Sequence, residues 1–379
     1  MSTSDVTREG VRGQRPGRDA VTGSARVVGE EQRRRHGGRR GGPTRAPDAE
    51  FRSYYGRPVL NQVVWEASDI GGYLFLGGLA GASSVLAAGA DLTGRDALAR
   101  PLKYTALAAI SGSVVALVHD LGRPERFLNM LRVVKPTSPM SVGTWILTAY
   151  GPLAGVAAVT AATGWFPRIG RAATLGAAAV GPLVATYTAP LVCDTAVPSW
   201  HEGYRYMPFL FAASASAAAG GAGLVASPLG QSGPARRAAV GGALVETAVS
   251  TVMEHRMGLA GEPYRLGTAG VFVRAAKALT LAGAAGAVLG RRSRTVSALS
   301  GAALLAGSAC TRLGVFHAGK QSAADPRYTV VPQRRRMAER AAGADGGQEA
   351  RAEAAGRAAG RAGSGGAGGG DAAGGDAGA

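Results

Sequence analysis

The polar segment at residues 119–141 carries the densest set of chemically active side chains in the sequence. It reads HDLGRPERFLNM from His119 to Met130 and ends in SPMS at residues 138–141. Five ionisable groups fall within its first eight residues. Histidine and carboxylate side chains exchange protons, and arginines bind anions. The segment is therefore suited to proton transfer and to pairing with a charged partner.

A second dense cluster, at residues 187–202, contains Asp194, His201 and Glu202. These groups can also exchange protons. Pro190 precedes them and predicts a broken helix end, which lines a cavity or a protein contact rather than lipid. The alternative is a solvated loop anchored at the membrane interface by Trp200. That alternative explains the tryptophan well and the density of Asp and His poorly.

Two isolated carboxylates lie in apolar surroundings. Asp69 is one turn into its segment, with Tyr73 one further turn along the same helical face. Burying an unpaired charge in a membrane is costly, so an ionisable residue at this depth indicates a function. The alternative is that Asp69 caps the start of its helix or pairs with an arginine. Glu246 is deeper; it is protonated, paired with Arg274 or Lys277, or part of a proton path.

The elements that position these residues follow from the distribution of apolar residues. The mean hydropathy is only +0.07, but the chain divides into three parts. Residues 1–50 hold eleven Arg and no Lys, and residues 334–379 are rich in Ala and Gly. Neither tail can bury enough apolar surface to offset its ordering entropy, so both are predicted to be disordered. Residues 51–333 form an apolar block whose repeated stretches have the length of a bilayer crossing.

The sequence predicts an all-α integral membrane protein with about eight transmembrane helices. Their expected positions are 68–90, 102–119, 141–163, 172–193, 205–226, 238–254, 269–289 and 295–316. The sixth is the weakest because it is short and contains Glu246, and a seven-span alternative leaves it in the interface. Gly77 and Gly81 indicate close helix–helix contact in the first span.

Alternating helix directions gather the ionisable residues of unlike charge on one membrane face, here named the mixed face. Its expected residues are Trp65, Glu66, Asp69, His119, Asp120, Asp194, His201, Glu202, Glu254, His255 and His317. The opposite, basic face receives Arg95, Arg100, Lys103, Arg168, Arg171, Arg236, Arg237, Arg291, Arg292 and Arg294. The arginine-rich tails favour a cytoplasmic mixed face, whereas the short loops favour a cytoplasmic basic face.

Composition excludes several kinds of site. Cys193 and Cys310 stand alone without a CxxC motif, so this chain by itself cannot hold an iron–sulfur cluster or a structural zinc. Two transmembrane haems need histidine pairs at two depths, whereas these histidines share one, so at most one haem could be held. Interfacial histidines or a proton-handling site are expected instead of a haem. The net charge of +17 lies largely on interhelical loops, where it favours a lipid bilayer rather than nucleic acid as partner. Phosphate-loop, nucleophile-elbow and zinc-protease motifs are absent from the sequence.

Several unusual motifs, in this order along the chain, resemble the NrfD/PsrC family of polysulfide-reductase membrane subunits. They are residues 65–73 with 76–78, 120–127, 138–145, 194–202 and 319–328. The resemblance covers about residues 52–333 and leaves out both tails.

The resemblance implies a haem-free, multi-pass subunit of the cell membrane, built as two four-helix bundles. It implies a quinone cofactor, either menaquinone or ubiquinone, and electron exchange with a ferredoxin-like iron–sulfur subunit. That partner would in turn serve a molybdopterin oxidoreductase catalytic subunit, so this chain is not expected to be catalytic alone. The alternatives are a membrane anchor without quinone chemistry and a proton- or ion-translocating transporter subunit.

The quinone pocket implied by the resemblance is expected near the mixed face. Its candidate binding residues are Trp65, Asp69, Tyr73 and His119. The candidate proton-transfer residues are Asp69, His119, Asp120, Asp194, His201 and Glu246. Three arginines, Arg123, Arg126 and Arg132, are expected to dock an acidic iron–sulfur protein or lipid headgroups.

Overall fold

The structure is a computed structural model that describes residues 6–7, 10–11, 59–60, 63, 65–120 and 125–340, without the side chains of residues 6–7, 10–11, 126 and 128. Most of the two predicted tails, and residues 121–124 of the polar segment with Arg123, lie outside the described residues. Two short strands near the N-terminus, β1 (Val6–Thr7) and β2 (Gly10–Val11), pair antiparallel. Residues 1–328 and 329–379 form separate compact units.

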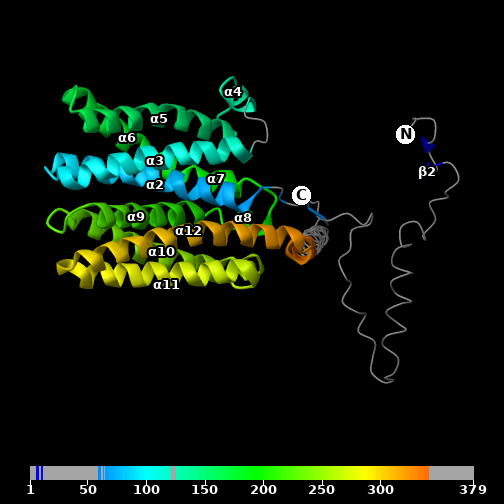
Figure 1. The fold of residues 1–379 in the computed structure, drawn as a ribbon. Coiled ribbons are helices and arrows are strands. Elements are labelled where there is room, and N and C mark those ends of the chain that lie inside the picture. The colour runs from blue at the N-terminus through cyan, green and yellow to red at the C-terminus, as the bar shows by residue number, and fades with distance from the viewer. Residues whose placement is uncertain are drawn as a thin grey trace, which may run out of the picture. The chain divides into compact units, whose positions relative to one another are not determined.

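Eight long helices make up the part of residues 65–328 that the structure describes (Figure 1). They are α2 (Ala67–Leu92), α3 (Asp96–Asp120), α5 (Pro139–Thr163), α6 (Pro167–Thr186), α9 (Met207–Ala226), α10 (Gly233–Arg256), α11 (Gly267–Leu289) and α12 (Arg294–Ala324). Shorter helical elements connect them: α4 (Arg126–Met130), α7 (Thr188–Cys193), α8 (Pro198–His201), η2 (Gly258–Tyr264) and η3 (Gly290–Arg292). Residues 327–340 are also helical.

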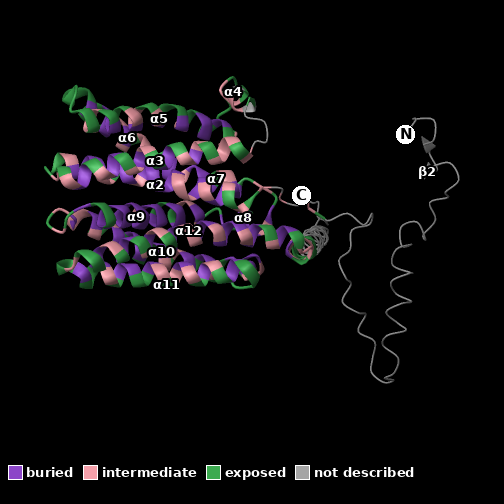
Figure 2. Ribbon diagram, viewed as in Figure 1, coloured by how far each residue is buried: buried purple, intermediate pink, exposed green. Residues whose placement is uncertain are grey.

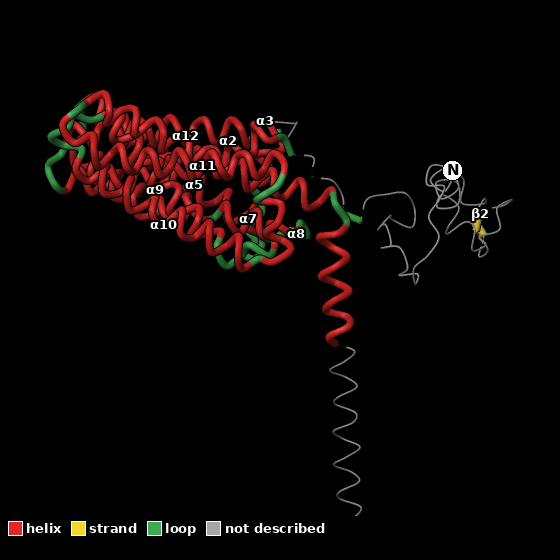
Figure 3. Tube along the Cα trace, turned by 90° about the horizontal axis from the view of Figure 1, so that it is seen from below, coloured by secondary structure: helices red, strands yellow, loops and turns green. Residues whose placement is uncertain are grey.

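The long helices lie side by side, with their connections gathered at two ends (Figure 3). Helices α2, α3, α5 and α6 pack together as the first bundle, and α9, α10, α11 and α12 as the second bundle. The bundles meet mainly along α2, which contacts both α9 and α12. The expected arrangement of two four-helix bundles is therefore confirmed.

Seven helical segments are long and apolar enough to cross a membrane, and they include every long helix except α10. Helix α10 corresponds to the weak sixth span, and it carries Glu246, Glu254 and two adjacent arginines near its start. It packs against α9 and α11 within the second bundle. The prediction of an all-α integral membrane protein is confirmed, and α10 is the helix whose composition departs from that of a lipid-facing span.

Glycine pairs permit the closest helix crossings. In the first bundle, a Cβ on Gly81 of α2 would overlap the carbonyl oxygen of Gly181 of α6. In the second bundle, a Cβ on Gly221 of α9 would lie 2.7 Å from the carbonyl oxygen of Gly301 of α12. All four of these glycines are buried, and Figure 2 shows much of α2 and α9 coloured as buried. Small residues let backbones approach and gain dispersion contacts, which drive helix association in lipid.

The fourth span is interrupted at Tyr187, between α6 and α7. Pro190 has no N–H to bond to the carbonyl of Thr186, which ends α6. The broken helix predicted from Pro190 is therefore present. The break turns the Tyr187 side chain into the bundle, where its ring packs over Gly143 of α5.

Candidate functional site

Asp69 and His119 form a hydrogen-bonded pair at the mixed face. The start of α2 and the end of α3 lie together, and Asp69 Oδ2 is 2.6 Å from His119 Nδ1. The Asp69 side chain is 17% exposed and that of His119 is 75% exposed. The pair thus joins a half-buried carboxylate to an imidazole that is open to a partner or ligand. Among the described residues Asp69 pairs with no arginine, and no side-chain hydrogen bond caps the start of α2.

A stack of aromatic rings begins at Trp65, four residues before Asp69. Trp65, just before α2, stacks on Trp200 of α8 with ring centroids 5.9 Å apart, and Phe316 of α12 lies 6.0 Å from Trp200 on its centroid. The Trp200 Nε1 donates to the carbonyl oxygen of Val315 at 2.8 Å. Trp200 is 1% exposed, so the alternative that made it an interface anchor is wrong. It is a core residue that connects the site to the second bundle.

Two tyrosines continue the site inward. The hydroxyls of Tyr73 in α2 and Tyr187 are hydrogen-bonded to each other, and both rings are buried. Ser113 of α3 donates to the carbonyl oxygen of Tyr73 at 3.2 Å, which fixes α2 against α3. The structure pairs Asp69 with His119 and Tyr73 with Tyr187, and Trp65, Asp69 and Tyr73 follow one another at four-residue spacing across the start of α2. We name these five residues the Asp69–His119 site.

Sequence reasoning did not single out Tyr187. The hydrophobic stretch containing it gives no information on which neighbour its hydroxyl meets. Its position three residues before Pro190 was the available signal, because a helix break reorients the residues around it.

Other predicted proton-transfer residues of the mixed face lie at separate places. Asp120 is half-buried against the backbone of Glu66, next to the site. Asp194 is exposed at the end of α7, and exposed His201 lies near Tyr204, with ring centroids 6.5 Å apart. These two residues are positioned for contact with a partner rather than for a buried pocket.

The loop that carries His201 is held rigidly by its neighbour Ser199. The Ser199 hydroxyl donates to the carbonyl oxygen of Ala260 at 2.8 Å, and its backbone N–H donates to Ser322 Oγ at 3.2 Å. Tyr264 donates to the Ser199 carbonyl oxygen at 3.0 Å. Burial raises the pKa of Tyr264 far above its ordinary value, so this phenol remains a neutral donor. The mixed face of the second bundle is thus fixed by hydrogen bonds.

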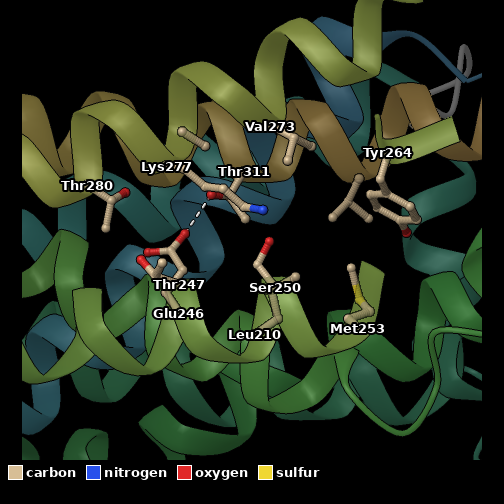
Figure 4. A pocket seen from close by; sticks show the side chains of 12 residues that line it. Leu210, Glu246, Thr247, Ser250, Met253, Tyr264, Val273, Lys277, Thr280 and Thr311 are labelled. Atoms are coloured by element: carbon tan, nitrogen blue, oxygen red, sulfur yellow. Dashed lines mark hydrogen bonds between the residues drawn. The ribbon is translucent and has the colours of Figure 1, made fainter. Parts of the chain in front are cut away.

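Glu246 belongs to a different polar cluster, inside the second bundle (Figure 4). Its Oε1 accepts a 2.5 Å hydrogen bond from Thr311 Oγ1. The proposed partner Lys277 instead pairs with Glu254 at 2.7 Å, and Arg274 donates to the carbonyl oxygen of Arg265. The alternative in which Glu246 pairs with Arg274 or Lys277 is therefore wrong. Glu246 lines a cavity of about 20 Å³, which has room for about one water molecule.

Arg312 of α12 completes this cluster and was not recognised from the sequence. It is fully buried, its guanidinium lies 3.7 Å from the ring centre of Phe211, and Nη2 donates to the Phe211 carbonyl oxygen at 2.8 Å. Its Nε and Nη1 have no hydrogen-bond partner among the described residues. A single arginine within an apolar span was the signal, because such residues are rare in membrane helices and pair with other groups.

Metal ligands are not clustered in the described part of the chain: no group of three or more His, Cys, Asp or Glu residues there could hold a metal ion. Cys193 and Cys310 are both free thiols. The groups that the described site offers are proton donors and acceptors and aromatic surfaces.

Taken together, these features define a multi-pass helical membrane protein with an acid–histidine pair and aromatic surfaces at one membrane face. The family model described as polysulphide reductase, NrfD, matches residues 58–240, and the chain belongs to this family. NrfD proteins are membrane subunits of oxidoreductase complexes. The matched region contains all five residues of the Asp69–His119 site and ends within α10. No curated protein matches the chain.

Proposed function

We propose that this chain is the quinone- or quinol-interacting membrane subunit of an oxidoreductase complex in the cell membrane. It passes electrons between the quinone pool and a ferredoxin-like iron–sulfur subunit that serves a molybdopterin catalytic subunit. The observation that carries the proposal is the Asp69–His119 pair, set among aromatic side chains at the membrane face. Membership of the NrfD family supports a role in such a complex.

The residues of the site fit a quinone head group. When bound, a quinone supplies a couple of two electrons and two protons. His119 can donate a hydrogen bond to a carbonyl oxygen, and Asp69 holds the other side of its ring through Nδ1. A proton can therefore move along a short, oriented path between the exposed imidazole and the half-buried carboxylate.

The interior part of the site orients the ligand. The hydroxyls of Tyr73 and Tyr187 are the donors that lie deeper in the first bundle, and Trp65 offers a flat apolar surface. An apolar groove of about 390 Å³ runs between α5 and α6 past Val142 and Leu183, one turn from Tyr187. We assign it to the isoprenoid chain, because its lining is almost entirely apolar and it opens toward lipid.

Replacement of the acid–histidine pair tests the proposal. In membranes that contain the complete complex, Asp69→Asn and His119→Ala should each lower quinone-linked electron transfer by about 100-fold, the usual contribution of a proton-transfer group. The matched control is His255→Ala, because His255 is an exposed histidine of the mixed face in the second bundle. The control should retain its rate, and all three variants should assemble with their partners.

Unchanged rates in both site variants would remove Asp69 and His119 from the reaction. Binding of a quinol analogue to the complex separates the proposal from its nearest alternative. A protein that assembles normally but binds no analogue would be a membrane anchor without quinone chemistry.

The polar interior of the second bundle favours a second candidate function, proton conduction. Glu246, Thr311 and Ser250 line the water-sized cavity, and Ser250 donates to Glu254 at 3.0 Å. This sequence of groups leads from the middle of α10 toward the mixed face. Proton flux into proteoliposomes in the absence of a redox partner, abolished by Glu246→Gln, would favour a transporter subunit.

A further inference from the structure

A crevice of about 410 Å³ lies between the two bundles, away from both polar sites. Its walls come from α2 and α6 on one side and from α9 and α10 on the other. The walls consist mainly of small or aliphatic residues, among them Val85, Leu86, Ala185, Ala212 and Ala219. The volume is within the roughly 300–1,000 Å³ range of ligand pockets.

The polar end of the crevice is purely cationic. Arg95, in the turn before α3, and Arg237, in the first turns of α10, are the charged residues that line it. Arg237 is exposed and Arg95 half-buried, and neither side chain has a hydrogen-bond or ion-pair partner among the described residues. Both are therefore available to an anion.

Neighbouring arginines at this end of the molecule have structural tasks. Arg236 donates to the carbonyl oxygen of Ala287 at 2.8 Å, and Arg294 donates to that of Leu224 at 2.7 Å. These contacts satisfy carbonyls at the ends of helices α11 and α9. Arg95 and Arg237 serve no such carbonyl, and they converge on the same crevice from different bundles.

We propose that this crevice binds an anionic phospholipid, with its phosphate between Arg95 and Arg237 and an acyl chain between the bundles. Basic pockets between membrane helices recognise lipid headgroups in this way. A quinone fits the position less well, since its uncharged head group leaves both guanidinium groups without a counter-ion. Charge complementarity and the apolar depth of the crevice therefore select a lipid.

The bound lipid would add to the contact between the two bundles. Beside the crevice, Gln231 of the α9–α10 connection accepts a 2.9 Å hydrogen bond from the backbone of Ala97 in α3. An acyl chain that contacts α2, α6, α9 and α10 would add apolar contacts where small side chains leave a gap. The lipid is thus a structural component at the junction of the two bundles.

The test measures lipid retention and thermal stability of the full-length protein, purified in detergent and stripped of lipid. Phosphatidylglycerol should raise the melting temperature and remain bound in native mass spectrometry, whereas phosphatidylcholine should do neither. R95Q/R237Q should weaken phosphatidylglycerol binding by about 30-fold, because each surface arginine contributes roughly a five-fold effect. R291Q/R292Q removes the same charge from an exposed turn outside the crevice and should bind as the wild type does.

A second variant tests the apolar part independently of charge. A Cβ at Gly89 would meet no atom within 4 Å, and Gly89 lines the crevice, so Gly89→Leu should fold and exclude the acyl chain. Equal retention in R95Q/R237Q and in R291Q/R292Q, equal stabilisation by phosphatidylcholine, or the same stabilisation by inorganic phosphate alone would overturn the proposal. Displacement of the lipid by a quinone analogue would reassign the crevice to quinone.

Discussion

Gly319→Ala is the substitution that most directly tests how the aromatic stack supports the Asp69–His119 site. A Cβ at residue 319 would overlap ring atoms of Trp200, which is packed against this glycine. The ring must shift, and its 2.8 Å hydrogen bond to the Val315 carbonyl oxygen is then lost. The shift also disturbs Trp65, because the two rings are stacked.

The magnitude follows from three contributions. Forcing a methyl group into a packed core costs about 1–3 kcal/mol, and loss of the hydrogen bond costs about 1 kcal/mol. Alanine has a greater helix propensity than glycine, which offsets about 0.8 kcal/mol of this destabilisation. The free energy of unfolding should therefore fall by about 2 kcal/mol, and the rate of quinone-linked electron transfer should fall with the displacement of Trp65.

The assay is reversible unfolding of the full-length protein in mixed detergent, with Gly72→Ala as control. A Cβ at Gly72 meets nothing within 4 Å, so this variant should be as stable as the wild type or slightly more stable. If Gly319→Ala and Gly72→Ala unfold alike, Trp200 does not depend on the space at Gly319. The account of how the stack is held would then be refuted.

Two further predictions concern buried polar groups. Tyr73→Phe and Tyr187→Phe should each destabilise the protein by about 1–3 kcal/mol, because each leaves the other hydroxyl buried without its partner. The double variant should cost less than the sum of the two, and a double-mutant cycle of unfolding free energies measures the difference. Glu246→Ala should cost about 1–3 kcal/mol, because buried Thr311 then loses its carboxylate acceptor and buried Arg312 loses the electrostatic stabilisation of that carboxylate. The double variant Glu246→Ala/Arg312→Met also removes the buried guanidinium charge, so it should recover much of the lost free energy of unfolding. A double variant as unstable as Glu246→Ala alone would show that the two charges are not coupled.

The fold class was predictable because it depends on local properties of the sequence. Apolar stretches of bilayer length predict spanning helices, and turn residues mark their ends. The weakness of the sixth span was also visible, since Glu246 lowers its hydropathy. The C-terminal end of α12 was less predictable. The helix continues to Ala324, eight residues past its expected end. Its last turns are polar, so they lack the apolar pattern of a span, but they contain no residue that breaks a helix.

The site was predictable only as far as helix direction determines it. Alternation of the spans places Asp69 and His119 on one membrane face, but their 2.6 Å contact depends on which helices are neighbours. The burial of Trp200 likewise depends on the space above Gly319, which lies more than a hundred residues away in the sequence. Such lateral contacts come from tertiary packing, which periodicity does not encode.

The glycine crossings described above have a consequence for biosynthesis. In each bundle the first helix crosses the fourth, so neither bundle can close until its last helix has left the ribosome. The first bundle can close at Gly81 and Gly181 while the second is still being made, because domains generally fold in order of synthesis. Arg312 belongs to the last helix and lies against both Phe211 and Gly78. Burial of the Arg312 charge therefore occurs only when the final helix inserts. That single step completes the second bundle and also completes its contact with the first bundle.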